Sequence, residues 1–258
     1  MSDWQKLSFR LKYLRSNYIK VIKMINMLDK KRRKNISVMM SDLASLYFSA
    51  PASYKSEYNS CFPGGLSRHS LQVMKGMVGL TNGLKIRDCD KDSIIILSLF
   101  HDLGKIGDGV DSYYIGNDEY WKSRGYNYKI NDKFNNIPPQ TLSLFLLQKY
   151  GVELTYNEYL AIHNINDKRN SYDGNDVTYL LNCANIWSVI QENKETVNLT
   201  EEVNDKENEI ELPQIIEESD STPESKNGVP SAVTTMPDGM IDFDDAIKGL
   251  GIGGGKTQ

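Results

Sequence analysis

The sequence contains few of the residues that commonly form disulfide frameworks and metal sites. Its three cysteines are scattered along the chain and form no CxxC pair. No disulfide framework is therefore expected, and a reducing compartment is favoured. No apolar run reaches 18 residues, so we expect no membrane span. The first residues lack the basic and then apolar layout of a signal peptide, and we expect a soluble, cytoplasmic protein.

Convincing strand patterns are also lacking, whereas apolar residues recur at helical spacing through most of the chain. The stripe from Trp4 to Leu28 predicts a helix packed on its own domain, with a coiled-coil dimer seam as the alternative. The helix predicted at 156–164 has a capping signal in Thr155 and Glu158. Further helices are predicted at 37–49, 66–80, 94–100, 140–150 and 176–190. The expected fold class is all-α.

Charge is divided unevenly along the chain. Residues 192–258 contain 16 Asp and Glu against 5 Lys and Arg, whereas residues 1–191 contain 18 acids and 25 bases. The basic body favours phosphate-bearing ligands, although many inert domains share such a bias. The acidic tail is too polar to bury a core and is predicted to be disordered. Its patch at 240–247 can fold as a short helix on a protein partner.

These features divide the chain into three parts. We predict a helical N-terminal region at 1–50, a domain at 51–191 and the disordered acidic tail at 192–258. Within the domain, residues 107–139 lose the helical period and are rich in Tyr, Asn, Gly and Asp. A long loop inside a compact domain is usually functional, and its aromatic residues argue against disorder. We interpret it as a lid or wall over a site.

Histidine is scarce as well, and this makes its positions informative. The apolar run 94–100 ends in His101 and Asp102, and Lys105 follows shortly after. Ionisable groups at the end of a buried helix are costly unless they are paired or bind a metal. Adjacent His and Asp residues supply only two ligands, so other helices have to bring the rest. His69 is placed to do so from the helix at 66–80, and Asn185 from the helix at 176–190.

Two stretches carry a resemblance to a known family. Phe62-Pro63-Gly64-Gly65-Leu66-Ser67-Arg68-His69-Ser70 is followed at a distance of about thirty residues by Phe100-His101-Asp102-Leu103-Gly104-Lys105. Together they resemble the HD-domain superfamily of metal-dependent phosphohydrolases, in the form of its phage-encoded members and of HD-type exoribonucleases. The resemblance covers roughly residues 60–190. It implies an HD-type helical bundle, located in the host cytoplasm if the protein is phage-encoded.

The resemblance also implies a divalent metal (Mn, Mg, Fe, Ni or Zn) held by His69, His101 and Asp102. The family's last ligand is an Asp on a late helix, and Asn185 stands at the matching position. Members that bind two metals add further histidines. Gln140 occupies one of those places, and His163 is the candidate for the other.

Further residues are candidates for catalysis and for substrate binding. Asp102 and Lys105 are the expected catalytic residues, because the lysine can neutralise charge that develops on a phosphate. Cations and aromatic rings suit the phosphate and the base of a nucleotide. The expected substrate-binding residues are Arg68, Arg124, Tyr114, Trp121 and Tyr126.

Two functions remain open at this point. The first is a metal-dependent phosphohydrolase that acts on a nucleotide or nucleic-acid phosphoester through a metal-activated water. The second is a catalytically degenerate HD-fold binding protein whose acidic tail recruits a protein partner. The complete set of His69, His101 and Asp102 favours the enzyme, whereas Asn185 and Gln140 favour the binding protein.

Overall fold

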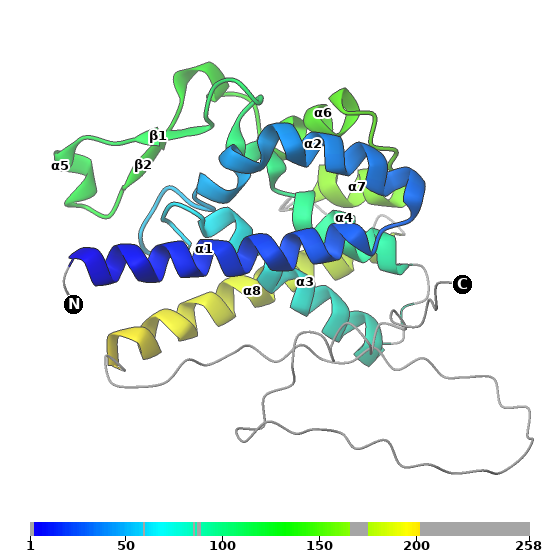
Figure 1. Ribbon diagram of the computed structural model, residues 1–258, viewed down its shortest axis with the longest axis horizontal. Coiled ribbons are helices and arrows are strands. Elements are labelled where there is room, and N and C mark those ends of the chain that lie inside the picture. Colours follow the sequence, from blue (N-terminus) through cyan, green and yellow to red (C-terminus); the bar gives the residue numbers. More distant parts are fainter. Residues whose placement is uncertain (1–2, 59, 85, 87–88, 166–174, 202–258) are drawn as a thin grey trace, which may run out of the picture.

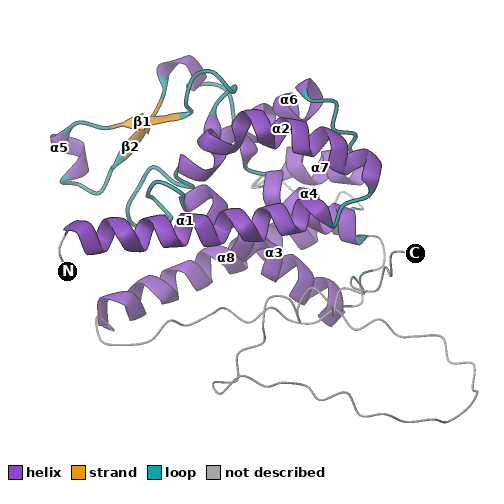
Figure 2. Ribbon diagram, viewed as in Figure 1, coloured by secondary structure: helices purple, strands orange, loops and turns teal. Residues whose placement is uncertain are grey.

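A computed structural model describes residues 3–58, 60–84, 86, 89–165 and 175–201, and it is mostly helical (Figure 1). Helices account for 67% of the structure, and the described strands form one small two-stranded sheet (Figure 2). The predicted all-α class is therefore confirmed at this level. None of the described helices combines the length and the apolar character that a membrane span requires. The predicted disordered tail lies outside the described residues from position 202 onward.

The elements follow one another in the order α1 (Asp3–Asn26), α2 (Lys30–Ser49), α3 (Gly65–Leu84), α4 (Lys91–Phe100), η1 (Leu103–Ile106), β1 (Tyr114–Gly116), α5 (Glu119–Lys122), β2 (Tyr128–Ile130), η2 (Asp132–Phe134), α6 (Pro139–Lys149), α7 (Tyr156–Asn164) and α8 (Asp176–Glu201). Each helix predicted from apolar spacing is present, and α7 has the predicted bounds whereas the others begin or end at different residues. The capping box at the start of α7 is also confirmed, since Glu158 N donates to Thr155 and Thr155 N donates to Glu158.

Helix α4 lies at the centre of the bundle. Its N-cap is Asp90, whose carboxylate accepts from the backbone N–H of Ser93. Every residue from Ser93 to Phe100 is buried, and α4 contacts α1, α3 and α7. A helix that is apolar on all sides has to be buried on all sides. This arrangement carries the end of α4, and with it His101, into the interior.

Two boundaries differ from the prediction. Helix α2 begins at Lys30 and not at residue 37, so the basic run after α1 forms its first turn. Arg32 in that turn forms an ion pair with the fully buried Glu158. Helix α8 continues beyond Gln191 to Glu201, so the acidic tail cannot begin at residue 192 as predicted. Glu192 is buried against the bundle, which the composition of that stretch did not reveal.

Residues 113–135 form a projection that we call the arm (Figure 2). Strands β1 and β2 pair antiparallel in it, with Tyr114 opposite Ile130, whereas the sequence pattern predicts no strand. Each strand has only three residues, too few for an alternating pattern to be recognised. The base of the arm has a small hydrophobic cluster of Tyr113, Phe134 and Leu142.

Candidate metal centre

Helix α3 presents His69 one turn after two glycines that shape its start. Gly64 has a φ of +90°, which an L-residue rarely adopts. A Cβ on Gly65 would collide with the carbonyl oxygen of Ser60. Ser60 itself has a φ of 64°, so the loop before α3 turns sharply at this point. The two glycines thus let this loop pack directly on the helix that carries His69.

His101 and Asp102 occupy the turn between α4 and η1. His101 is the C-cap of α4, and Asp102 precedes η1. Ser143 on α6 holds this turn, because its hydroxyl accepts from Gly104 N at 2.8 Å and lies 2.9 Å from the carbonyl oxygen of His101. A Cβ on Gly104 would collide with the backbone of Pro139. Gly104 is therefore needed for the close approach of α6.

Three of the five predicted metal ligands converge in the interior. His69, His101 and Asp102 expose 4%, 0% and 3% of their surface. Asp102 Oδ2 lies 3.6 Å from His69 Nε2 and 3.4 Å from His101 Nε2. One potential ligand atom from each residue lies within 4.8 Å of the others. Of the residues that the structure describes, these are the ones that could hold a metal ion.

Hydrogen bonds determine which nitrogen of His101 carries the proton. Nδ1 lies 3.0 Å from the carbonyl oxygen of Leu97 and 3.2 Å from that of Ser98. Carbonyl oxygens only accept, so Nδ1 is the donor. Nε2 is buried and forms no hydrogen bond. In the neutral ring, its lone pair therefore points toward the Asp102 carboxylate, whose Oδ2 lies 3.4 Å away.

The Nδ1 of His69 also faces an acceptor, which here is a carboxylate oxygen and not a backbone carbonyl. Nδ1 lies 3.0 Å from Oε1 of Glu192 on α8. The other carboxylate oxygen of Glu192 accepts from Ser60 Oγ at 2.8 Å. Burial by itself raises the pKa of Glu192, but attraction to the His69 ring and the hydrogen bonds from His69 and Ser60 lower it overall. Glu192 is therefore an acceptor, and the Nε2 of His69 is left to face Asp102.

Lys105 supplies positive charge to the centre. Its Nζ lies 2.6 Å from Asp102 Oδ2. Burial alone would raise the pKa of Asp102, but the Lys105 ammonium is the largest opposing influence, and the pKa is held well below its usual range. Asp102 is therefore a carboxylate at neutral pH.

These residues fit a divalent metal. Two ligand atoms bound at about 2.0–2.2 Å to one tetrahedral ion lie roughly 3.4 Å apart, close to the separations from Asp102 to the two rings. An acceptor bound to Nδ1 leaves Nε2 as the ligand and makes it more basic. A cation between the two Nε2 atoms and the carboxylate of Asp102 would be bound by all three groups. Two imidazoles favour a transition metal over Mg²⁺.

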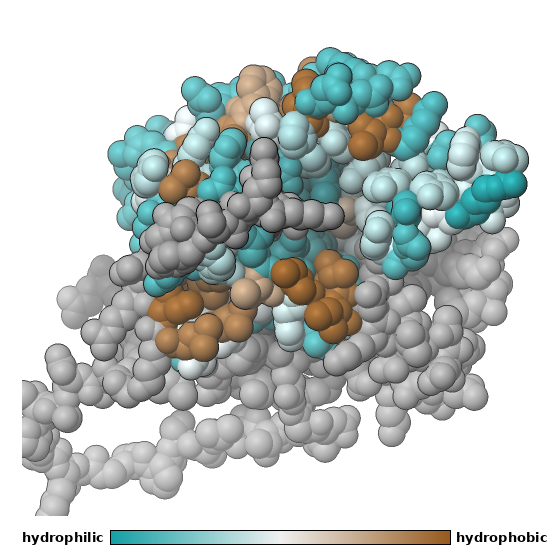
Figure 3. Space-filling view, turned by 180° about the vertical axis from the view of Figure 1, so that it is seen from behind, coloured by the Kyte–Doolittle hydropathy of each residue, from teal (hydrophilic) through white to brown (hydrophobic). Residues whose placement is uncertain are grey.

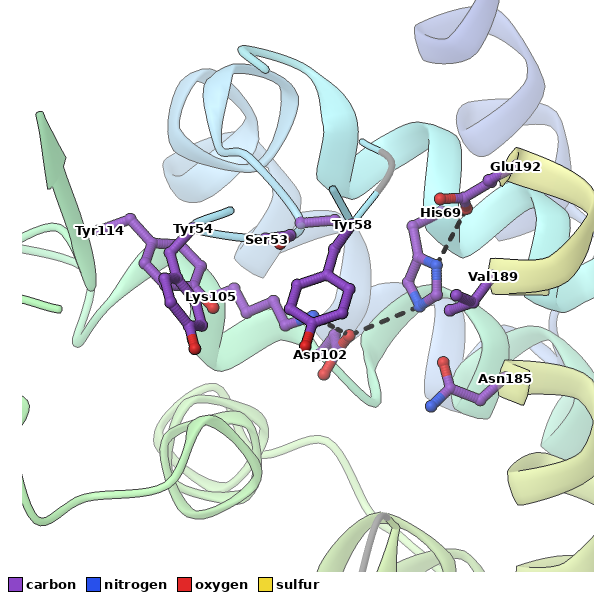
Figure 4. A pocket seen from close by; sticks show the side chains of 11 residues that line it. Ser53, Tyr54, Tyr58, His69, Asp102, Lys105, Tyr114, Asn185, Val189 and Glu192 are labelled. Atoms are coloured by element: carbon purple, nitrogen blue, oxygen red, sulfur yellow. Dashed lines mark hydrogen bonds and ion pairs between the residues drawn. The ribbon is translucent and has the colours of Figure 1, made fainter. Parts of the chain in front are cut away.

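A pocket of about 400 Å³ opens beside the centre (Figure 4). His69, Asn185 and Glu192 lie at one end of it, Tyr54 and Tyr114 lie at the other, and Lys105 lies between them. It is lined by Ala52, Ser53, Tyr54, Tyr58, His69, Asp102, Lys105, Tyr114, Asn185, Val189 and Glu192. The pocket thus combines a polar end with an aromatic end.

The predicted site residues fall into two groups. Asn185 and Tyr114 line the pocket together with the metal ligands and Lys105. Arg68 does not line it, and its guanidinium lies over the ring of Phe62. Trp121, Arg124 and Tyr126 are on the arm, outside the pocket lining. The pocket therefore includes only part of the predicted substrate-binding set.

His163 is not brought to the centre. It is exposed on α7 and stacks on Tyr159 with a ring distance of 5.9 Å. Ala161, Ile162 and Ile165 take the inward positions of this segment, so His163 faces outward. Gln140 likewise does not line the pocket. The structure thus places the two positions considered for a second metal away from the pocket lining.

Several pocket residues were not predicted. Glu192 was assigned to the tail, although it follows Asn185 at a spacing of two helical turns and so shares its face of α8. Extending the helix predicted at 176–190 by a few residues would have placed Glu192 on the same face as Asn185. Ser53, Tyr54 and Tyr58 come from a loop without regular spacing, and no sequence signal identifies them.

Comparisons of the chain with models of protein families, with curated proteins and with solved structures give no match.

Proposed function

We propose that the protein is a metal-dependent phosphohydrolase that acts on a nucleotide or nucleic-acid phosphoester. One observation carries this proposal. Both His69 and His101 have Nδ1 engaged by an acceptor and Nε2 directed at Asp102. A buried structural histidine needs partners for both nitrogens, whereas a metal ligand needs a partner for only one. The resemblance of the two motifs to HD-domain phosphohydrolases supports the same reaction.

The residues of the chain have separate roles in this proposal. His69, His101 and Asp102 hold the metal, with the Asn185 carbonyl as a neutral fourth candidate. The bound metal supplies Lewis-acid chemistry, since it lowers the pKa of water and polarises a phosphoryl oxygen. Lys105 orients the phosphate and offsets the negative charge that develops on it. Its position between the two ends of the pocket suits this role (Figure 4).

The aromatic end of the pocket supports a substrate that carries a base. Tyr54 and Tyr114 have ring centroids 6.4 Å apart. Burial raises the pKa of Tyr114, so its hydroxyl stays protonated and neutral. Neutral rings next to a cation suit a ligand that has both a flat base and a phosphate.

The alternative is a binding protein with the HD fold and no catalysis. Two observations favour it. Asn185 contributes no charge where a carboxylate would bind a metal more strongly. In addition, the ion pair between Lys105 and Asp102 neutralises the centre without any metal.

A hydrolysis assay separates the two functions. The purified protein is tested with bis-(p-nitrophenyl) phosphate and a nucleotide panel in the presence of Mn²⁺ or Mg²⁺. Asp102→Ala is compared with Asp108→Ala, which removes a carboxylate that pairs with Lys133 away from the pocket. We expect hydrolysis that depends on metal and is lost in Asp102→Ala alone. A folded protein that stays inactive with every metal would favour the binding protein.

A further inference from the structure

A chain of aromatic rings leads from the pocket onto the arm. Tyr114 lies 6.4 Å from Tyr54, and Tyr54 lies 6.3 Å from Tyr126. Tyr126 lies 5.7 Å from Trp121, and Trp121 lies 5.3 Å from Tyr120. We call these five residues the aromatic track. Its first two rings line the pocket and its last two are on α5 in the arm.

Backbone hydrogen bonds fix the track relative to the pocket. Tyr128 N donates to Tyr54 O at 3.2 Å, and Ser56 N donates to Gly125 O at 2.7 Å. The loop that contains Tyr54 and Ser56 is thus hydrogen-bonded to Gly125 and Tyr128 in the arm. The rings form a continuous path because these two segments are held together.

The outer rings are not needed for the hydrophobic core. Tyr120 is 58% exposed and Trp121 is 45% exposed. Neither belongs to the main core or to the cluster at the base of the arm. In Figure 3 the arm lies at the right and is mostly pale or hydrophilic, without the large brown patches seen nearer the middle. Exposed aromatic side chains that adjoin one another and continue a path from a pocket are candidates for contact with a ligand.

Cations accompany the track. The Arg124 guanidinium lies 3.7 Å from the centre of the Tyr120 ring. Lys55 Nζ lies 5.0 Å from the ring of Tyr126 and 5.6 Å from that of Tyr58. Rings that offer a flat face, interleaved with cations, suit a strand whose bases are unpaired and whose backbone carries phosphates.

We infer that the substrate of the site is the end of a single-stranded polynucleotide, whose following nucleotides stack along the aromatic track. This inference rests on the proposed function for the reacting end. The pocket takes the terminal phosphoester between Lys105 and the metal ligands, while Tyr54 and Tyr114 take the adjacent base. Tyr126, Trp121 and Tyr120 then bind the next part of the strand. A duplex does not fit, because its bases are stacked on one another.

The nearly balanced charge of the arm makes it possible to distinguish base stacking from nonspecific electrostatic attraction to phosphates. Acidic and basic side chains nearly balance along residues 113–135. Binding that depends only on phosphate charge falls steeply with salt. We therefore expect binding here to fall only gently with salt and to resist competition by heparin, which has charge but no bases.

The test measures binding of fluorescent oligothymidylates of increasing length by anisotropy, in the presence of EDTA. Because no metal is present and no turnover occurs, the outcome is independent of hydrolysis. The track variant is Tyr120→Ala/Trp121→Ala. The matched control is Tyr156→Ala/Tyr159→Ala, which removes two tyrosines on α7 that are 76% and 46% exposed.

We expect affinity to rise with oligonucleotide length, and the track variant to bind a long oligonucleotide at least about tenfold more weakly, since each stacked ring contributes severalfold. The control variant should bind like the wild type. If the double variant melts earlier than the wild type, Trp121→Leu keeps an apolar side chain there and removes the aromatic face. A mononucleotide or a duplex that binds as tightly as the long oligonucleotide would overturn the inference. Equal losses in the track and control variants, or full competition by heparin, would also do so.

Discussion

Nδ1 of His69 lies 3.0 Å from Oε1 of Glu192, although 123 residues separate them in the sequence. This contact links α3 to α8 at the polar end of the pocket. Glu192 therefore belongs to the metal centre because it orients the ring of His69, and it is not itself a metal ligand.

The first prediction concerns this contact. Glu192→Gln keeps the size of the side chain but weakens its hold on the N–H of His69. We expect the affinity for Mn²⁺ to fall about 10–100-fold, as for other partners of metal-bound histidines. Titration calorimetry measures the affinity, and long-range proton–nitrogen NMR shows which His69 nitrogen carries the proton. An unchanged tautomer with unchanged affinity would limit Glu192 to a packing role.

The second prediction concerns the neutral residue at the end of the pocket. Asn185→Asp adds a carboxylate where Asn185 lines the pocket, and opposite charge attracts a divalent ion. We expect metal affinity to increase at least about tenfold. Asn182→Asp, about one turn earlier on the same helix, is the control for a general effect of charge. A similar gain in both variants, or none in either, would mean that Asn185 is not next to the metal.

The third prediction concerns the loop before α3. Gly65→Ala places a Cβ against the Ser60 carbonyl, and Gly83→Ala, near the other end of α3, meets no atom within 4 Å. We expect the first change to destabilise the protein by about 1–3 kcal/mol, as overpacking does. The second should be neutral or stabilising by up to about 1 kcal/mol, because Ala favours a helix. Urea denaturation measures both, and equal effects would contradict the packing described.

The fourth prediction concerns the ion pair between the partly buried Arg32 and the fully buried Glu158. Glu158 is fully buried, and it also accepts from Ser93 Oγ at 2.7 Å. Glu158→Ala leaves Arg32 without its partner and should cost about 3–5 kcal/mol. Glu153→Ala breaks a pair with Lys31 whose side chains are 67% and 74% exposed, and it should cost less than about 1 kcal/mol. Thermal unfolding of the two variants compares these costs, and similar melting temperatures would refute the difference.

The sequence was sufficient where regular spacing carries the information. Helices α3, α4 and α7 follow from apolar residues at helical intervals, and the capping box of α7 follows from Thr155 and Glu158. The convergence of His69 with His101 and Asp102 followed from the scarcity of histidine and from the two motifs. These features depend on local sequence patterns that can be recognised without knowing the tertiary contacts.

The sequence was insufficient where tertiary packing overrides local composition. Glu192 lies in a stretch whose acidic composition indicates a tail, yet α8 continues there because that residue packs on His69 and Ser60. His163 was considered a ligand because the family resemblance implies further histidines between the motifs, and the period of α7 turns it outward. The short strands β1 and β2 depend on pairing with each other and have no pattern of their own.

The most direct test of the account is the binding of Mn²⁺ by the full chain, measured by titration calorimetry with elemental analysis of the purified protein. We expect the wild type to bind a divalent metal and His101→Ala and Asp102→Ala to lose at least about 10–100-fold in affinity. His163→Ala, which changes the exposed histidine on α7, should bind like the wild type. A folded wild-type protein that binds no divalent metal, or variants of His101 and Asp102 that bind as tightly as it does, would contradict the account.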